Sequence, residues 1–366
     1  MSRALSSKSQ GPVKMKVLLA GGSGLLGDTI ISSLRSAAES NKAIVDVTVL
    51  SRSGPSSSTD SSSTDSSSAD STNFNLKHVK WDGETPTDLR DEEVEGLTHA
   101  INLCGENISE GGETIMAKLG IRSWEEENKK KRVISSRITP TVGLKRWLNS
   151  NGNLSPQMEY IVAGGVGVYG CDFFLNGKEA EDERADTSSR PGFLHEVSTL
   201  WEKAATEPPS PSTSSSDSNN HRTTILRIAP VLTSSGGVLG KLLLPFKLGL
   251  GGNVGSGTQY FPFISSSDFG SAVVDHIMMT PAKSDRVYNL IAPEPCTNEQ
   301  FGKELGAKLR RPTFMPMPAS VVKILFGEMG EEVLLGGVRA KPARLQEEGF
   351  TFKHPNIIKA IASILD

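Results

Sequence analysis

Three glycines near the start of the chain have the spacing of a site that binds phosphate groups. Gly21, Gly24 and Gly27 form a Gly-x-x-Gly-x-x-Gly pattern that directly follows the apolar run 16–20. In dinucleotide-binding proteins the first glycine allows a tight turn. The second lets the backbone approach a pyrophosphate, and the third lets the helix pack closely on the strand. The free N–H groups at the start of that helix favour an anion.

A glycine triplet alone can be an ordinary turn, so its flanking segments decide the interpretation. Leu26, Ile30 and Leu34 recur at helical spacing after the glycines, while the residues before them form a β-type apolar run. This is the strand–turn–helix context that a dinucleotide fingerprint requires. We therefore expect a nucleotide site at this turn.

The end of the second expected strand indicates which dinucleotide binds. The run 45–50 ends in Ser51 and Arg52. Proteins that bind NAD commonly carry an acid here, which accepts a hydrogen bond from the ribose 2′-hydroxyl. An arginine can instead bind a 2′-phosphate through a charge-assisted, often bidentate contact. The pair favours NADP, and the alternative is that Arg52 is a solvated surface side chain.

Strand-like and helix-like segments alternate along the first two thirds of the chain. The expected strands cover 16–20, 45–50, 76–81, 99–103, 158–163 and 224–228. This alternation predicts an α/β fold, a Rossmann-type doubly wound parallel sheet. From Gly236 onward, glycine, proline and mixed elements indicate a smaller C-terminal α+β substrate lobe.

Composition divides the chain into three parts and two inserts. We expect a flexible tail (1–13), an NADP-binding Rossmann domain (14–235), disordered low-complexity inserts (55–73 and 208–220), and a C-terminal lobe (236–366) of which about 268–292 returns to the Rossmann domain. The inserts are rich in serine and aspartate, and such segments bury too little apolar area to fold.

Charge and cysteine content exclude several classes of function. The 366 residues carry a formal charge of −3, and no apolar run is long enough for a membrane span, so we expect neither nucleic acid nor membrane binding. The three cysteines lie far apart without metal-type spacing, which indicates free thiols and no metal site. The first 16 residues are basic and lack acids. We expect a cytoplasmic protein, with organelle import as the alternative. These features specify neither a substrate nor an oligomeric state.

Several segments together resemble a known family. They are 21–24, 49–52, 102–107, 122–124, 136–137, 201–205, 244–252, 255–257, 261–264, 289–295 with Asn298, 311–312 and 316–318. The run Leu244–Gly252 is the most specific of them. In these segments the chain resembles the atypical short-chain dehydrogenase/reductase group called the epimerase family, member 39U. Bacterial relatives in that group are described as sugar-nucleotide-epimerase-like, and their C-terminal piece is a domain of unknown function. The resemblance covers residues 14–366 apart from the serine tracts and an insert near 110–120.

The resemblance implies an NADP(H) site. By position it includes Gly21, Ser23, Gly24, Leu25, Leu26, Gly27, Ser51, Arg52, Leu103, Cys104, Arg137 and Val231. Leu103 and Cys104 would lie under the adenine–ribose half of the cofactor. The alternative for Leu103 and Val231 is core packing, and both descriptions can hold together.

The residues for hydride-transfer chemistry do not follow the usual reductase pattern. Short-chain reductases use a Ser and a Tyr-x-x-x-Lys pair for proton transfer, but the expected positions here hold Gly164, Val197 and Trp201. Tyr169, at the end of the fifth expected strand, is the candidate proton donor. The alternative is a tyrosine that only packs.

Further polar residues lie near the expected site. Ser198 and Thr199 are on the helix that should carry Tyr-x-x-x-Lys, where a solvated hydroxyl is the simpler expectation. Glu106 could orient a ligand or cap the next helix. Relatives usually carry a histidine near Ser265. Arg227 closes the sixth expected strand, and it either pairs with Asp268 or touches substrate. The glycine-rich loop 249–257 could contact substrate or be a tight structural loop.

Two functions of different class follow. The first is an NADP-dependent oxidoreductase or epimerase with a non-standard proton donor. The second is a catalytically silent NADP-binding regulatory or scaffold protein. A fold alone does not establish a reaction.

Overall fold

The structure is a computed structural model that describes residues 11–52, 73–86, 89–108, 127–171, 180–207 and 221–366. The expected tail up to residue 10 and both serine tracts, apart from Asn73, lie outside the described residues. So does the insert near 110–120.

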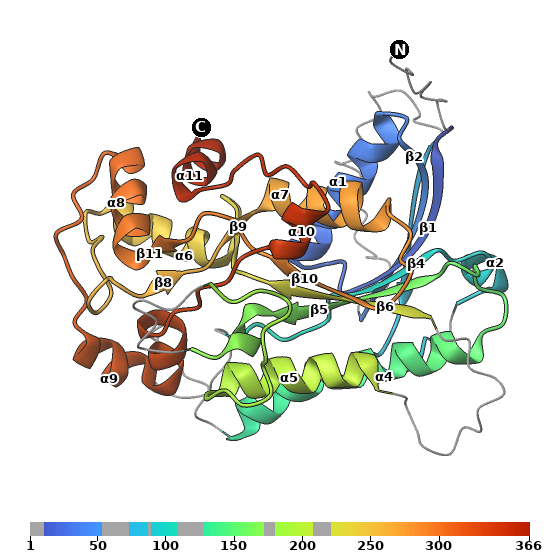
Figure 1. The fold of residues 1–366 in the computed structure, drawn as a ribbon, viewed down its shortest axis with the longest axis horizontal. Helices are drawn as coiled ribbons and strands as arrows, with labels where there is room; N and C mark the ends of the chain where they lie inside the picture. The colour runs from blue at the N-terminus through green and yellow to red at the C-terminus, as the bar shows by residue number, and fades with distance from the viewer. Residues whose placement is uncertain (1–10, 53–72, 87–88, 109–126, 172–179, 208–220) are drawn as a thin grey trace, which may run out of the picture.

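The helices and strands alternate along the chain as the sequence predicts (Figure 1). In the first part they are β1 (Val13–Ala20), α1 (Leu25–Glu39), β2 (Ala43–Ser51), β3 (Phe74–Lys80), α2 (Asp91–Val94), β4 (His99–Asn102), α4 (Glu127–Ser150), β5 (Glu159–Gly165), a 3-10 turn (Val166–Tyr169), α5 (Phe193–Thr206) and β6 (Arg222–Ile228). In the second part they are β7 (Val231–Leu232), α6 (Gly237–Lys247), β8 (Tyr260–Phe261), β9 (Ile264–Ser265), α7 (Ser266–Ser271), a π-helical segment (Ala272–Met278), β10 (Arg286–Leu290), β11 (Cys296–Thr297), α8 (Asn298–Leu309), α9 (Ala319–Met329), a second π-helical segment (Gly330–Leu335), α10 (Ala343–Glu347) and α11 (Ile357–Leu365).

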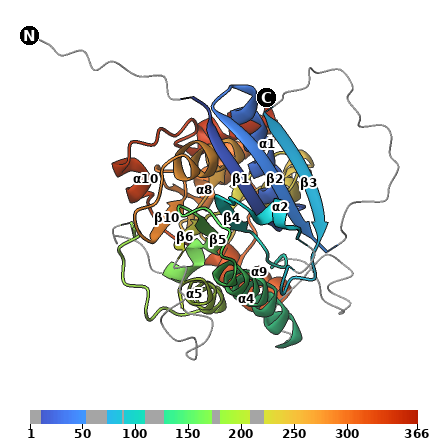
Figure 2. The ribbon, with the colours of Figure 1, turned by 90° about the vertical axis from the view of Figure 1, so that its right-hand side faces the viewer.

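A seven-stranded sheet forms the centre of the molecule, in the order β10-β6-β5-β4-β1-β2-β3. Each neighbouring pair in it is parallel. Helices α1 and α7 cover one face, and α4 and α5 cover the other (Figures 1 and 2). This confirms the predicted doubly wound α/β fold, in which ligands bind beyond the carboxyl ends of the strands.

Apolar periodicity explains how α1 attaches to the sheet. Ile30 and Leu34 are fully buried against β1 and β2, and Leu26 packs on the same cluster. Full burial of such a side chain contributes about 1.5–3 kcal/mol. The three apolar residues at helical spacing therefore attach α1, the helix that follows the glycine turn, to the sheet.

Strand limits differ from the sequence prediction at several ends. β1 begins at Val13 rather than near Lys16, because Val13 and the next residues pair with the strand that begins at Ala43. β4 ends at Asn102, one residue earlier than expected. Cross-strand pairing sets these limits, and apolar runs alone do not report it. The domain boundaries remain predictions.

A smaller lobe of helices and short strands lies beside the sheet (Figure 1). Its core joins α6, α8 and α11 through side chains that include Phe246, Phe301 and Ile361. The antiparallel pair β8–β11 and the parallel pair β7–β9 belong to this region. Among the described residues, no helix is long and apolar enough to cross a membrane.

Candidate functional site

The turn between β1 and α1 requires glycine at its first position. Gly21 has a φ of +80°. A Cβ on it would lie 2.9 Å from the Leu103 carbonyl carbon. The Leu103 N–H donates to the Ala20 oxygen at 2.9 Å, so β4 ends directly beside the turn. A side chain at Gly21 would both strain the backbone and push these segments apart.

The other glycines join the turn to α1 and β2. A Cβ on Gly27 would lie 2.4 Å from the Gly22 Cα, and one on Gly22 would lie 2.7 Å from Val49 Cγ1. Gly24 is the N-cap of α1, which has no side-chain cap, and the nearest atom to a Cβ built there is 3.8 Å away. The outer side of the helix N-terminus is therefore open, with N–H groups that can donate to a phosphate.

Arg52 and Cys104 lie at the same edge as this turn. Arg52 is exposed just after β2, and Ser51 is the last residue of that strand. Burial raises the pKa of the Cys104 thiol to about 12, and the nearby charge of Arg52 opposes the rise. The thiol therefore stays protonated at neutral pH, and the arginine is close enough to act on it electrostatically.

The remaining expected cofactor residues are also packing residues. Leu103 contacts the apolar clusters on both faces of the sheet, and Val231 belongs to one of them. The buried Arg137 guanidinium donates to the backbone oxygens of Val133 (2.8 Å) and Glu106 (3.1 Å). Burial lowers the Arg137 pKa to about 10, opposed by Glu106. No group of three His, Cys, Asp or Glu side chains suited to a metal occurs in the described ranges.

Gly164, Val197 and Trp201, which occupy the positions of the usual reductase relay, are closely packed against neighbouring residues. A Cβ on Gly164 would lie 3.4 Å from both Ile225 Cγ2 and the Leu226 oxygen. Val197 and Trp201 are buried in apolar clusters. The Trp201 indole N–H donates to Thr141 Oγ1 at 3.0 Å. Val197 and Trp201 thus pack in the core, and Gly164 has no side chain.

Tyr169 lies in a buried polar network. Its hydroxyl is 2.8 Å from Asn289 Oδ1 and 3.0 Å from the Asp182 carbonyl oxygen, the two groups to which it can donate. It accepts from Arg227 Nη1 at 3.0 Å. Burial raises the Tyr169 pKa to about 12, against the opposing effect of Arg227. The hydroxyl is thus fully partnered, as expected for a tyrosine that packs, and its role as proton donor stays a prediction.

Arg227 does not pair with Asp268, so the alternative of a salt bridge between the two is wrong. Its Nε and Nη2 donate to Glu202 at 2.8 and 2.9 Å, a bidentate contact across β6 and α5. Asp268 is fully buried and instead accepts from the backbone N–H groups of Lys353 and His354, at 2.8 and 2.9 Å.

Comparison with known proteins identifies the family. Residues 317–364 match the family described as "Domain of unknown function (DUF1731)". The chain is 31% identical to "Epimerase family protein Mb2239" of Mycobacterium bovis, over 94% of this chain and 96% of that protein. The chain belongs to this epimerase family. The crystal structure of human epimerase family protein SDR39U1 with NADPH matches at a TM-score of 0.74 and 27% identity, covering 96% of this chain and 99% of that one. An Arabidopsis thaliana relative, "Epimerase family protein SDR39U1 homolog, chloroplastic", is 29% identical over 74% of this chain and 70% of its own length.

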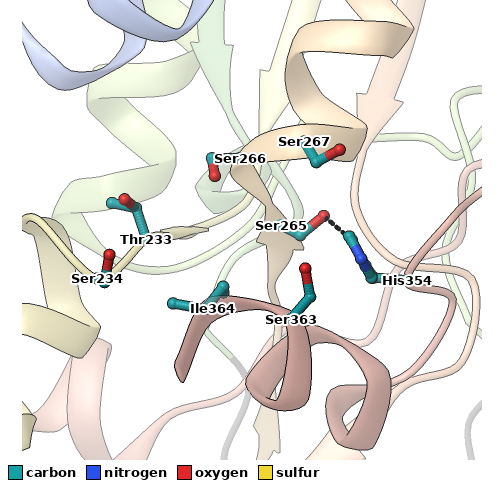
Figure 3. A pocket seen from close by; sticks show the side chains of 8 residues that line it. All are labelled: Thr233, Ser234, Ser265, Ser266, Ser267, His354, Ser363 and Ile364. Atoms are coloured by element: carbon teal, nitrogen blue, oxygen red, sulfur yellow. Dashed lines mark hydrogen bonds between the residues drawn. The ribbon is translucent and has the colours of Figure 1, made fainter. Parts of the chain in front are cut away.

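Ser265, in this epimerase-family chain, lies next to His354 from a distant segment (Figure 3). Ser265 Oγ is 2.9 Å from His354 Nδ1, 3.0 Å from Asp268 Oδ2, and accepts from the Asp268 N–H at 3.1 Å. Eight residues line a hollow of about 180 Å³ beside this pair: Thr233, Ser234, Ser265, Ser266, Ser267, His354, Ser363 and Ile364. The capping of α7 and the docking of the C-terminal segment account for the Ser265 contacts.

The glycine-rich loop of this epimerase-family chain is closely packed. A Cβ on Gly251 would lie 2.7 Å from the Phe246 ring, and one on Gly252 would lie 2.1 Å from the Met315 oxygen. Gly249, at φ +77°, adopts the left-handed region. These contacts favour the structural alternative for Gly251 and Gly252.

Ser198 and Glu106, two other polar candidates, lie in surroundings that the sequence did not predict. Ser198 is 6% exposed, so the expectation of a solvated hydroxyl is wrong. A Cβ on Gly165 would lie 3.4 Å from Ser198 Oγ. Glu106, which follows β4, accepts from Lys129 Nζ at 2.6 Å, and its Oε2 lies 3.5 Å from Arg132 Nε; it therefore forms ion pairs with two residues of α4.

Several buried polar residues beside the candidate site were not predicted from the sequence. Asn102 is fully buried; it accepts from the Cys104 N–H at 3.0 Å and donates to Thr141 Oγ1 at 2.9 Å. Glu202 and Asn289 orient Arg227 and Tyr169. A polar residue inside an otherwise apolar strand, as in β4, was the signal that could have revealed Asn102.

Proposed function

We propose that this epimerase-family chain binds NADP(H) at the edge formed by the Gly21–Gly27 turn and the ends of β2 and β4. The observation that carries the proposal is Arg52 at the end of β2, where an acid would favour NAD. The open N-terminus of α1 supports it as the site of the pyrophosphate. The human SDR39U1 structure described with NADPH supports the same cofactor here.

The reaction class that we propose is oxidoreduction or epimerisation of an unidentified small molecule. NADP(H) would supply hydride transfer when bound. The chain's own residues would hold the cofactor, with Ser51, Arg52, Leu103, Cys104, Arg137 and Val231 as the proposed contacts beyond the glycine turn. Tyr169 is the proposed proton donor, although its contacts with Arg227 and Asn289 equally support a positioning role.

The alternative is a catalytically silent NADP-binding regulatory or scaffold protein. One observation favours it: Gly164, Val197 and Trp201 occupy the relay positions and pack as core residues. General acid–base catalysis typically contributes a hundred- to ten-thousand-fold, so loss of this relay without replacement would leave little turnover.

One experiment separates the two functions. NADPH oxidation would be screened against carbonyl compounds and sugar nucleotides, with NADPH binding measured on the same preparation. Substrate-dependent oxidation supports the enzyme. Bound NADPH without oxidation on a broad panel supports the silent protein, and absence of NADPH binding contradicts both.

For localisation we keep the cytoplasmic prediction, with organelle import as the alternative. The Arabidopsis relative carries "chloroplastic" in its name, and the basic first 16 residues fit an import signal equally well. Imaging of the full chain with a C-terminal fluorescent tag distinguishes the two.

A further inference from the structure

The carboxyl ends of β2 and β3 lie side by side. Ser51 and Lys80 are the last aligned pair of these parallel strands. The Trp81 N–H then donates to the Ser51 oxygen at 2.9 Å. Neighbouring strands are about 4.8 Å apart, and directly paired residues project from the same face. Lys80 therefore stands next to Ser51, one residue before Arg52.

The glycine turn borders the same place. Gly22 packs on Val49, which is aligned with His78, one side-chain repeat before the Ser51–Lys80 pair. The place that would receive the adenosine half of a dinucleotide is thus bordered by β3, the edge strand of the sheet. Lys80 is the last residue of β3.

Lys80 and Arg52 are two cations without an anionic partner among the described residues. Both side chains belong to exposed residues, and neither forms an ion pair or hydrogen bond within the described ranges. Lys77, on the same strand, differs because its Nζ is 4.0 Å from Glu92 Oε1. The nearest acid after Lys80 in the chain is Asp82, whose Oδ1 accepts from the Glu84 N–H at 2.8 Å. Within the part of the chain that the structure describes, the β2–β3 edge therefore has two positive charges that no carboxylate neutralises.

We infer that Lys80 is a second cation for the 2′-phosphate of NADP, beside Arg52, and that it contributes to the choice of NADP over NAD. The inference rests on the proposed cofactor site. A phosphate monoester carries about −1.5 to −2 charges at pH 7. One guanidinium leaves part of that charge unbalanced. A lysine ammonium on a flexible stem supplies the balance as a point charge. NAD has a hydroxyl at this position and gives Lys80 no charge to neutralise.

The test measures dissociation constants of NADPH, NADH and 2′-AMP for the full chain by calorimetry at low salt. Lys80→Ala should weaken NADPH and 2′-AMP about fivefold, the upper range for an exposed ion pair, and leave NADH within twofold. The salt dependence of NADPH binding should become shallower. Lys80→Arg should retain the affinity, because it keeps the charge. Lys77→Ala is the matched control on the same strand and should change nothing.

The outcomes separate this inference from the proposed function. If the wild type prefers NADPH and Lys80→Ala binds NADPH and 2′-AMP as tightly as the wild type, Lys80 has no such role and the cofactor site stands. Equal weakening of NADPH and NADH would also overturn the role, because it would indicate disturbance of the whole site. A wild-type chain that binds no NADPH would overturn both.

Discussion

Removal of the Tyr169 hydroxyl tests the buried network at the end of β5. Tyr169→Phe keeps the ring and its volume, so it creates no cavity of the kind that makes large-to-small changes costly. It deletes one oxygen that lies 2.8 Å from Asn289 Oδ1 and 3.0 Å from Arg227 Nη1. Arg227 keeps its two contacts with Glu202, and Asn289 keeps its Nδ2 contact with the Lys341 oxygen at 2.9 Å.

The expected cost follows from these contacts. A buried polar group left without a partner costs about 1–3 kcal/mol. Asn289 Oδ1 loses its donor entirely, whereas Arg227 loses one of three contacts. We expect a decrease of about 2 kcal/mol in the free energy of unfolding, measured by urea denaturation with an unchanged slope. Tyr260→Phe, at a half-buried tyrosine in the C-terminal lobe, is the control and should change it by less than about 0.5 kcal/mol.

The same variant also decides the role of Tyr169 in any reaction. NADPH affinity should stay within about twofold. If Tyr169 donates the proton, turnover falls at least about a hundredfold. A variant as stable as the wild type would refute the network reasoning, and unchanged turnover would remove Tyr169 as the donor.

Three further predictions concern the turn, one buried histidine and the first insert. Gly27→Ala places a Cβ 2.4 Å from the Gly22 Cα, so the turn must shift. The affinity for NADPH should fall about tenfold or more, and the free energy of unfolding should fall by about 1–3 kcal/mol. An NADPH titration identical to that of the wild type would contradict this prediction. Burial lowers the His99 pKa to about 4. Because the unfolded chain takes up a proton at this histidine near pH 6.5 and the folded chain does not, the free energy of unfolding should fall as the pH decreases from 6.5 toward 4, by at most about 1.4 kcal/mol per pH unit. His99→Gln should reduce this pH dependence of the free energy of unfolding, measured by urea denaturation. The same pH dependence in the variant and the wild type would contradict the prediction. Deletion of 55–73 should leave the melting temperature and NADPH affinity nearly unchanged, because a serine–aspartate tract makes few contacts; a loss above about 2 kcal/mol would show that the tract packs.

The fold could be predicted because its signals are local. The β1–turn–α1 unit is predicted by the glycine spacing of Gly21–Gly27 and by the apolar residues Ile30 and Leu34. The parallel sheet is predicted by the short apolar strands. Each of these signals lies within a few residues of sequence. Strand ends were less accurate, because Val13 extends β1 only through pairing with β2.

The polar network could not be predicted, since its members come from distant parts of the chain. Tyr169 contacts Asp182, Arg227 and Asn289. The salt-bridge alternative for Arg227 named the wrong carboxylate because residue type alone does not distinguish Asp268 from Glu202. The burial of Ser198 likewise depends on how α5 meets Gly165 and Gly167, which no helical pattern records.

The most direct test of the proposed NADP site is a calorimetric titration of the wild type and Arg52→Ala with NADPH and NADH. We expect the wild type to bind NADPH at least about tenfold more tightly than NADH, because the charge-assisted contact with the 2′-phosphate contributes about 1.5–3 kcal/mol. Arg52→Ala should lose most of that difference, keep at most the roughly fivefold share assigned to Lys80, and bind NADH unchanged. Equal affinity of the wild type for the two cofactors, or an Arg52→Ala variant that keeps full preference for NADPH, would contradict the account.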